Sequence, residues 1–206
     1  MRRRPILIPS LFMTTINMGL MSLDNMLFSS PPKACPVCGG RPGPYDTKEK
    51  IYANIITDTG INKINVRVRR FKCRDCGTLI YADEPFYPNT RVGSVIIDTA
   101  LSLSSVNSYS KTAKIMNTLG IDINRGTVRN YALSNLPMQK SGIFYGLRMP
   151  ATFVSLISKS AAYSQTIDQY DVLELSRYPS YYHPPKDGKG TASEFFKNKT
   201  VKFRDF

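Results

Sequence analysis

The 206-residue sequence predicts an α+β protein in which a small antiparallel sheet, built on four cysteines, precedes a helical segment. Three observations predict this class. The cysteines come as two closely spaced pairs, a period-two alternation runs into the second pair, and short helical patterns separated by a glycine follow. The hydrophobic fraction of 42% supplies enough apolar area for a packed core, which argues against wholesale disorder.

The chain is strongly basic. It has 28 Lys and Arg residues against 15 Asp and Glu residues, which gives a formal net charge of +13. A charge of this sign predicts an anionic partner, either nucleic acid or an acidic membrane surface.

The first element is an apolar segment at residues 1–32. Its start, with arginines at positions 2–4 and no charged residue from 5 to 23, imitates a signal peptide. Two prolines and several polar residues dilute the apolar run, and no small-residue cleavage site follows it. We therefore expect a short helix packed on the sheet, or a start codon placed too early, and no membrane partner.

The second element, residues 33–83, contains both cysteine pairs, Cys35 with Cys38 and Cys73 with Cys76. Each Cys-x-x-Cys loop directs two thiolates toward one point, so two loops supply the four sulfurs of a tetrahedral Zn²⁺ site. A glycine follows the second cysteine of each pair and readily takes the positive φ that such a loop needs. Four thiolates leave no open position for water, so we expect the zinc to be structural.

Disulfide bonds and an iron site are the alternatives for these cysteines. Two disulfides require an oxidising compartment. A thioredoxin-type redox site requires one pair in a βαβ unit rather than two matched loops. Iron bound by the same four thiolates stays open as an alternative.

The residues between the two pairs predict strands. Residues 51–57 are rich in β-branched side chains, 58–60 mark a turn, and 64–72 alternate apolar and polar residues. Another short strand is expected at 78–81. Two cysteine loops joined by a small antiparallel sheet make a zinc ribbon, which we expect over residues 33–83.

The strand before Cys73 is rich in cations. Alternation places Arg67 and Arg69 on the face opposite Val66 and Val68. Such cations either keep the surface solvated or contact phosphates. The predicted DNA-binding residues of the ribbon are Arg67, Arg69, Arg70 and Lys72.

A helical segment is expected over residues 89–136, after a linker at 84–90 that two prolines punctuate. Asn89 or Thr90 is the expected cap of its first helix, which runs through 94–103.

The next two helices predict a helix-turn-helix. Ser110 caps residues 111–119, Gly120 ends that helix, and Asn124 caps a helix from 125 to 134. The outward face of the last helix carries residue types that contact base edges and phosphates. Its predicted DNA-binding residues are Arg125, Thr127, Arg129 and Asn130. The alternative is a small helical bundle that binds nothing.

Residues 69–77 read Arg-Arg-Phe-Lys-Cys-Arg-Asp-Cys-Gly, and the helix pair follows at 111–131. This combination resembles the N-terminal DNA-binding region of archaeal and bacterial insertion-sequence transposases, and the resemblance covers residues 33–136. It implies that the helix pair binds the terminal inverted repeats of a transposable element, in DNA transposition and recombination.

The catalytic part of such transposases does not carry over to the C-terminal region, residues 137–206. The family places two Asp and one Glu on an RNase H-like sheet to hold two magnesium ions. Here Asp168, Asp171 and Glu174 are spaced by three, which puts them on one helix or turn. We expect at most the start of a truncated catalytic domain there, then a loop or extended arm at 177–190, and we assign no catalytic residue.

The expected function is zinc-stabilised, sequence-specific binding of double-stranded DNA in a prokaryotic cytoplasm, at the nucleoid. The chain would be a truncated or split transposase, and its further partners would be a second copy of itself or a separate catalytic chain. The alternatives are a transcriptional regulator of the same architecture, a compact metal-dependent DNA-cleaving transposase that uses Asp168 or Asp171, and a protein-interaction module.

Overall fold

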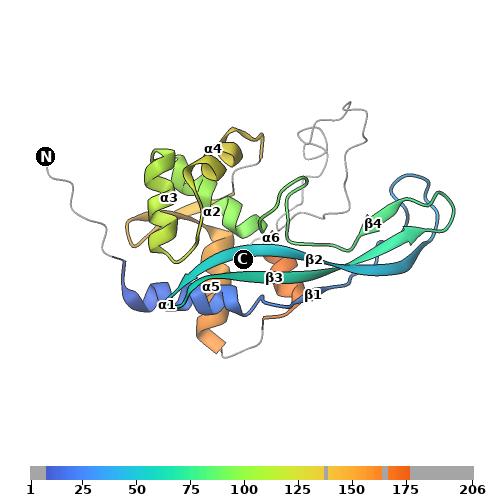
Figure 1. Cartoon of the computed structure of the whole chain (residues 1–206), viewed down its shortest axis with the longest axis horizontal. Helices are drawn as coiled ribbons and strands as arrows, with labels where there is room; N and C mark the ends of the chain where they lie inside the picture. Colours follow the sequence, from blue (N-terminus) through green and yellow to red (C-terminus); the bar gives the residue numbers. More distant parts are fainter. Residues whose placement is uncertain (1–7, 137–138, 164–166, 177–206) are drawn as a thin grey trace, which may run out of the picture.

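The computed structural model describes residues 8–136, 139–163 and 167–176, and it shows the mixed α+β architecture that the sequence predicts (Figure 1). Its central feature is a long antiparallel hairpin of β2 (Pro42–Thr57) and β3 (Gly60–Cys73). Two short strands, β1 (Leu27–Phe28) and β4 (Leu79–Tyr81), also pair with β3, in parallel and antiparallel orientation respectively.

The alternation predicted for β3 is confirmed, because Val66 and Val68 are fully buried while Arg67 and Arg69 are exposed. The hairpin turns at residues 58–59, and Gly60 has a φ of +125°, which side chains other than glycine rarely adopt. The first half of β2 was not predicted. Residues 44–49 are all exposed, so they lack the alternation that marks a half-buried strand, and their pairing with β3 defines them instead.

Three helices follow the sheet: α2 (Ser94–Ser104), α3 (Tyr109–Thr118) and α4 (Arg125–Leu133). Figure 1 shows them together on one side of the hairpin, near its turn, while the cysteine loops lie at its other end. Asn124 caps α4 as predicted, since its side chain accepts the N–H of Thr127 at 2.8 Å. Gly120, with a φ of +86°, follows α3 in the left-handed conformation that was expected.

Two predicted helix caps are wrong. Ser108 rather than Ser110 caps α3, because the helix begins at Tyr109 and the Ser108 hydroxyl accepts the N–H of Lys111. Gly93, in an extended conformation, precedes α2 in place of Asn89 or Thr90.

Residues 84–90 are not the exposed linker that the two prolines predicted. Phe86 and Tyr87 are 2% and 1% exposed, and Glu84 is also buried. One cluster of buried side chains extends from Phe12 to Val172 and includes residues of the sheet and of every helix in the described part of the chain. The segment therefore joins the sheet to the helices through packed core.

The connection between α3 and α4 is hydrogen-bonded to the outer edge of β2. The N–H of Ile56 donates to the Gly120 carbonyl at 2.7 Å, and the N–H of Asp122 donates to the Asn54 carbonyl at 2.9 Å. Ile55 and Ile121 form an isolated antiparallel bridge between these bonds. The helix pair is thus joined to the hairpin by backbone hydrogen bonds.

The remaining helices are α1 (Ser10–Met21), α5 (Ala151–Tyr163) and α6 (Gln169–Ser176). The short N-terminal helix that was expected is α1, and it packs on α5 as well as on β2. Gly19 of α1 lies against Ser160 of α5, where a Cβ would make an ordinary van der Waals contact at 3.5 Å.

No secondary structure was predicted for the segment 141–150. A hairpin of β5 (Ser141–Phe144) and β6 (Leu147–Pro150) occupies it, and α5 starts only at Ala151. Tyr145 and Gly146 have φ values of +48° and +75°, which are typical of a two-residue hairpin turn.

One carboxyl group is buried in the helical core. Asp98 of α2 is 1% exposed and accepts hydrogen bonds from the hydroxyls of Tyr87 and, at 3.3 Å, Thr152. Gln139 donates to the Tyr87 hydroxyl at 3.3 Å. Burial raises the pKa of Asp98 to about 7 against the two hydrogen bonds, which lower it.

Several predicted features lie outside the described residues. They are the arginines at 2–4, the loop or extended arm expected at 177–190 and the rest of the chain to residue 206.

Candidate metal centre and nucleic-acid interface

The two Cys-x-x-Cys loops fold in the same way. In the first loop, the N–H of Gly39 donates to the Cys35 carbonyl and the N–H of Cys35 donates to the Gly40 carbonyl, both at 2.9 Å. The second loop repeats this pattern, at 3.1 and 2.9 Å, with Cys73, Gly77 and Thr78 in the equivalent positions. Gly39 and Gly77 have φ values of +73° and +72°, so both glycines serve the purpose predicted from the sequence.

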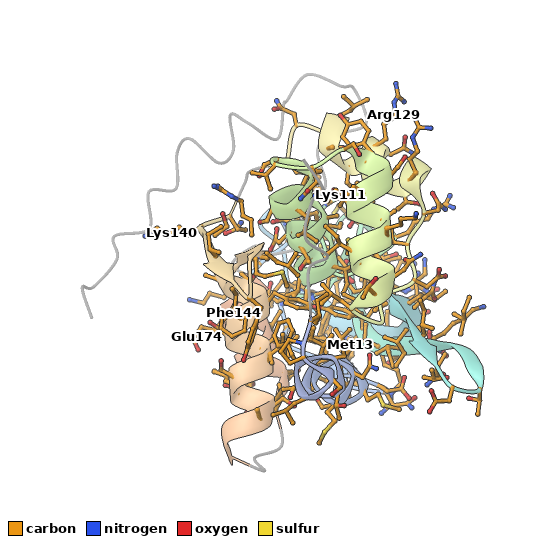
Figure 2. The ribbon with its side chains drawn as sticks, turned by 90° about the vertical axis from the view of Figure 1, so that its left-hand side faces the viewer. Met13, Lys111, Arg129, Lys140, Phe144 and Glu174 are labelled. Atoms are coloured by element: carbon orange, nitrogen blue, oxygen red, sulfur yellow. The ribbon has the colours of Figure 1, made fainter. Side chains whose placement is uncertain are left out.

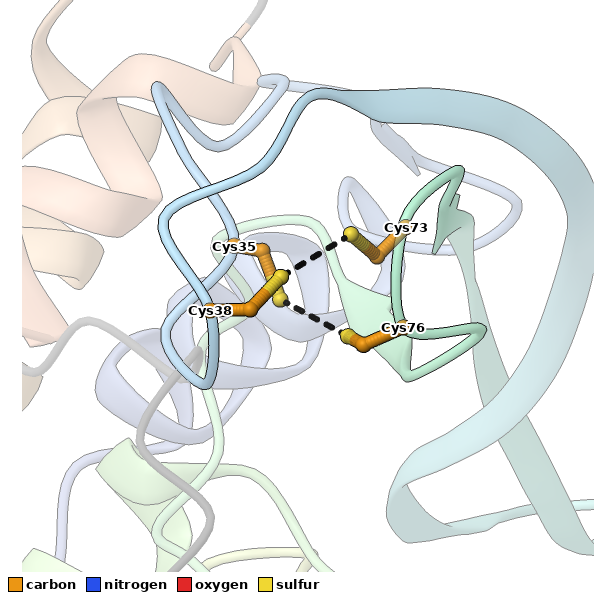
Figure 3. Close-up of side chains that lie close together, drawn as sticks. All are labelled: Cys35, Cys38, Cys73 and Cys76. Atoms are coloured by element: carbon orange, nitrogen blue, oxygen red, sulfur yellow. Dashed lines mark hydrogen bonds between the residues drawn. The ribbon is translucent and has the colours of Figure 1, made fainter.

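The loops bring the four sulfurs together (Figure 3). The sulfurs of Cys38 and Cys73 are 3.5 Å apart, those of Cys35 and Cys76 are 3.6 Å apart, and all four lie within 4.8 Å of one another. All four cysteines are free, whereas a disulfide would require about 2.0 Å. Sulfurs that each lie about 2.3 Å from one tetrahedral ion are about 3.8 Å apart. The spacing therefore suits a metal ion.

The chemistry of the donors also suits a metal. Cys35 and Cys73 are 3% and 2% exposed, whereas Cys38 and Cys76 are exposed. A metal ion could therefore enter from the solvent side and be shielded from water on the other side. Hydrogen bonding with Thr78 lowers the pKa of Cys76 to about 6, which favours the thiolate form that binds metals. Within the described ranges, no other group of three or more Cys, His, Asp and Glu side chains comes together in this way.

The four predicted cations of β3 divide between its two faces. Arg67 and Arg69 are exposed on one face, and the period of two puts Arg70 and Lys72 on the other. The guanidinium of Arg67 donates to the Asn25 carbonyl at 3.2 Å. No carboxylate of the described residues forms an ion pair with Arg69.

Arg70 is already paired. Its Nε donates to Asp46 at 2.6 Å and its Nη2 donates to the second oxygen of the same carboxylate. These bonds lower the pKa of Asp46, which therefore stays charged across the neutral range. Tyr45, beside Asp46, is 58% exposed and lies at an irregularity in β2 that is opposite Arg70 and Phe71.

On the Arg70 face, cations and aromatic rings alternate from the cysteine loops toward the helices. The Tyr45 ring lies 5.8 Å from the Lys72 ammonium and 5.9 Å from the Arg70 guanidinium. The Tyr81 ring lies 5.9 Å from Arg70 and 5.5 Å from Lys50, whose ammonium is 4.2 Å from the Phe86 ring. We call this series the cation–aromatic ladder; its members are Lys72, Tyr45, Arg70, Tyr81, Lys50 and Phe86.

The predicted contact residues of α4 also divide between two faces. Arg125 and Arg129, one turn apart, are exposed on the outer face, and Figure 2 shows Arg129 directed away from the rest of the protein. Thr127 and Asn130 are turned by roughly 100–160° from these arginines around the helix axis and line a hollow between α4 and β2. Val128 is fully buried.

Two hollows, each of about 550 Å³, lie beside β2, and one of them adjoins the ladder. The hairpin hollow lies beside the ladder and is lined in part by Lys48, Tyr81 and Phe86. The α4 hollow is lined in part by Thr127 and Asn130. Ile51, Asn89 and Arg91 line both, so the two hollows meet there.

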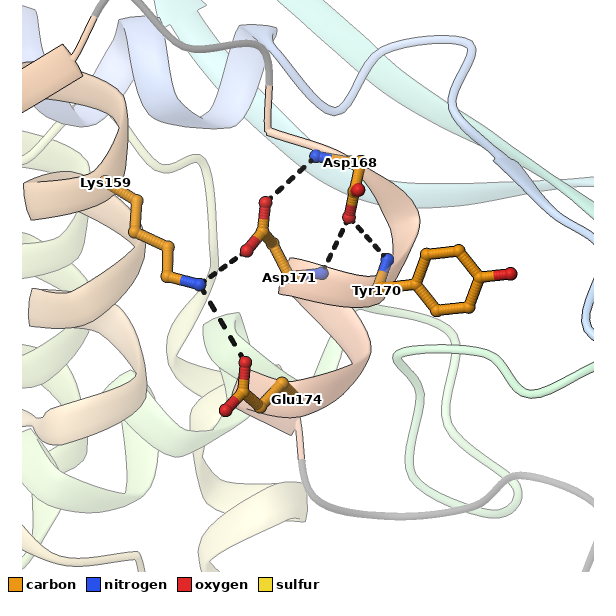
Figure 4. A network of polar contacts seen from close by, with 5 residues as sticks. All are labelled: Lys159, Asp168, Tyr170, Asp171 and Glu174. Carbon is orange, nitrogen blue, oxygen red and sulfur yellow. Dashed lines mark hydrogen bonds and ion pairs between the residues drawn. The ribbon is translucent and has the colours of Figure 1, made fainter.

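The acidic residues near the end of the described chain stabilise local structure (Figure 4). Asp168 accepts the N–H groups of Tyr170 and Asp171 at 2.8 and 2.9 Å, at the start of α6. The carboxylate of Asp171 accepts a hydrogen bond from Lys159 at 2.5 Å, and Glu174 lies 3.9 Å from the same ammonium. These carboxylates are thus held by a helix start and a lysine rather than grouped around a common point.

Sequence reasoning missed most of this surface. Its residues come from β2, from β4 and from the segment that follows β4: Tyr45, Lys48, Lys50, Tyr81 and Arg91. Only the strand register and the packing of 84–91 bring them together. The interleaving of cations with tyrosines within 45–50 and 67–81 was the one available signal.

Comparison of the chain with protein-family models, with curated proteins and with solved structures gave no match. Across the described residues, none of the helices has the length and apolar character needed to cross a membrane.

Proposed function

We propose that this chain is a zinc-stabilised protein that binds double-stranded DNA with sequence preference, as a zinc ribbon joined to a helix-turn-helix. The observation that carries the proposal is the cation–aromatic ladder, which leads from the cysteine loops to the hollows beside α4 on one face of the hairpin. Lys72 and Tyr45 are the exposed members of the ladder, whereas Phe86 is buried and Lys50 is ion-paired with Glu84. An exposed cation beside an exposed ring suits a partner that offers both phosphates and base faces.

Zinc has a structural part in this proposal. Four thiolates complete its tetrahedral shell, so it would bind no substrate and activate no water. It would fix the two loops relative to each other and hold Lys72 and Arg74, which flank Cys73, at the end of the hairpin. Because such a site rarely pre-forms, metal binding and folding of the loops would be one event.

The helix pair α3 and α4 would supply base readout. Its exposed surface is basic, with Lys111, Lys114, Arg125 and Arg129 against the single acid Asp122 over residues 106–136. The backbone bonds of Gly120 and Asp122 to β2 hold the pair at a constant distance from the cysteine loops. We therefore propose that ribbon and helices contact one duplex together.

The partner DNA that we propose is the terminal inverted repeat of a transposable element, with this chain as part of a truncated or split transposase. The support for this finer statement is the sequence resemblance over residues 33–136 and the basic surface above. A transcriptional regulator of the same architecture would use the same surface. DNA selected by the purified protein from a random pool distinguishes the two, because the transposase assignment requires the selected motif to occur as inverted repeats at both ends of an element.

A salt titration with two variants tests the proposed face. A labelled duplex of about 30 base pairs, close to three helical turns, is bound by the intact protein and by Lys72→Ala and Arg69→Ala. Both side chains are exposed and three residues apart on β3, but they lie on opposite faces. This proposal departs from the sequence prediction that Arg67 and Arg69 bind DNA, because they lie on the face opposite the ladder. We therefore expect Lys72→Ala to lower the slope of log affinity against log salt by about 1, and Arg69→Ala to leave it unchanged.

Two results would count against the proposal. If Arg69→Ala lowers the slope and Lys72→Ala does not, DNA lies on the other face of the hairpin. If the intact protein binds no duplex at any salt concentration, the function itself is wrong.

A further inference from the structure

The α4 hollow has the dimensions and lining of a small-molecule site rather than of a flat phosphate-binding surface. Its volume of about 550 Å³ falls within the range of ligand pockets, roughly 300–1,000 Å³. Apolar side chains line one part of it: Val92, Ile96, Ile121 and Ile123. The backbone bonds between 120–122 and β2 make this part rigid.

Side-chain amides line the rest of the α4 hollow. Asn54, Asn89, Asn124 and Asn130 all contribute, together with Thr127. The Asn54 Oδ1 is buried and has no hydrogen-bond partner in the described residues. An amide that is held in place and lacks a partner costs free energy unless a ligand satisfies it.

One cationic side chain, Arg91, lies at the mouth of the α4 hollow. Arg91 lies where the α4 hollow meets the hairpin hollow, it is exposed, and no carboxylate of the described residues forms an ion pair with it. The one acid in the lining of the α4 hollow is Asp122. A ligand with a neutral ring and a single anionic group fits this arrangement better than a cation or a lipid chain does.

We propose that the α4 hollow binds one unpaired nucleobase of the bound DNA, with Arg91 on its phosphate. This inference rests on the proposed function. A stacked and paired base exposes only its edges, so it cannot fill a hollow of this depth, whereas an unpaired base brings a flat apolar ring and a polar edge. Asparagine amides pair with base edges through both donor and acceptor atoms, and the apolar floor receives the ring.

Two duplexes that differ by one nucleotide test the inference. One is fully paired, and the other carries a single unpaired 2-aminopurine near its centre, a base whose fluorescence rises when it leaves the stack. We expect the intact protein to bind the second duplex about tenfold more tightly and to increase its fluorescence.

The matched variants are Ile51→Trp and Ile61→Trp. Both isoleucines are exposed on the same hairpin, at 39% and 61%, but only Ile51 lines the hollows. We expect Ile51→Trp to bind both duplexes equally, because the indole occupies the junction, and Ile61→Trp to keep the preference. A second pair, Arg91→Ala and Lys63→Ala, replaces exposed cations and tests the phosphate contact if Ile51→Trp does not fold.

Binding to the paired duplex with no preference for the unpaired base would overturn this inference and leave the proposed function intact. An unchanged preference in both Ile51→Trp and Arg91→Ala would also overturn it. Failure to bind either duplex would overturn both proposals.

Discussion

Gly93 and Tyr52 are in direct contact at the junction of the sheet and the helices. The N–H of Gly93 donates to the Tyr52 carbonyl at 2.8 Å, and a Cβ at position 93 would lie 2.3 Å from the Tyr52 ring. Tyr52 is fully buried, so its ring has no free space into which to move.

Gly93→Ala should therefore destabilise the protein by about 1–3 kcal/mol, as overpacking of a core does. Urea denaturation measures the change. Gly142→Ala is the matched control, because no atom lies within 4 Å of a Cβ at that position. Equal stability of the two variants would show that the junction is looser than the structure indicates.

Asp98→Asn should remove a pH dependence of stability. The pKa of Asp98 is raised to about 7 in the folded protein, against about 3.9 when unfolded. Between these values the folded state binds more protons, so the free energy of unfolding falls as pH rises from about 4 to 7. An asparagine at position 98 carries no charge. Its side-chain amide can still accept a hydrogen bond from the Tyr87 hydroxyl and can donate one to the Thr152 hydroxyl.

Thermal unfolding at several pH values tests this prediction. We expect the variant to be more stable than the natural protein at pH 8, by roughly 2–4 kcal/mol at most, and similar to it near pH 4. If the difference in stability between the natural protein and the variant stays the same from pH 4 to pH 8, the pKa of Asp98 is not raised.

Asp46→Ala should strengthen DNA binding. The Asp46 carboxylate accepts two hydrogen bonds from the Arg70 guanidinium, and its negative charge lies beside the cation–aromatic ladder. Its removal frees Arg70 for a phosphate, so we expect affinity to rise a few-fold at low salt and the salt slope to steepen by about 1. The comparison variant is Asp58→Ala, at the turn of the hairpin. A loss of affinity in Asp46→Ala would show that the ion pair orients Arg70 for binding.

Metal removal should unfold the cysteine loops and spare the helices. The amides of Gly39 and Gly77 are hydrogen-bonded only within their loops, whereas the amide of Asp122 is bonded to β2. In hydrogen exchange after chelation, we expect Gly39 and Gly77 to lose protection while Asp122 keeps it. Loss of protection at all three amides would mean that the metal stabilises the whole chain.

The two parts of the interface should protect DNA at positions about one helical turn apart. The stretch of β2 from Pro42, opposite Cys73, to Ile55, opposite Ile121, spans roughly 40 Å at about 3.3 Å per residue. One turn of B-DNA is about 34 Å. Hydroxyl-radical footprinting on a selected duplex should show two protected patches at that spacing, and a single short patch would mean that only one part binds.

Local signals in the sequence were sufficient for the cluster of four cysteines and for two helix ends, those at Gly120 and Asn124. The spacing of the cysteines and the glycine after each pair determine the loop geometry, so their positions follow from a few neighbouring residues. Asn124 and Gly120 were predicted for the same reason. The hairpin of β5 and β6 was missed because Tyr145-Gly146 is not a common signal for its turn.

The proposed interface depends on contacts between distant residues, and the sequence alone did not reveal it. The position of Tyr45 between Lys72 and Arg70 follows from an irregularity in β2. Arg91 lies beside α4 because Phe86 and Tyr87 are buried. The prolines at 85 and 88 instead indicated a linker. Neither feature can be obtained from periodicity, since each depends on which strands and loops pair.

The most direct test of the account is the affinity of one protein sample for duplex DNA, measured by fluorescence anisotropy, with its metal bound, removed and restored. Mass spectrometry under native conditions gives the metal content at each stage. We predict one zinc ion per chain, a loss of affinity on its removal, and recovery when zinc is added. The same affinity in the metal-loaded and metal-free protein would contradict the account.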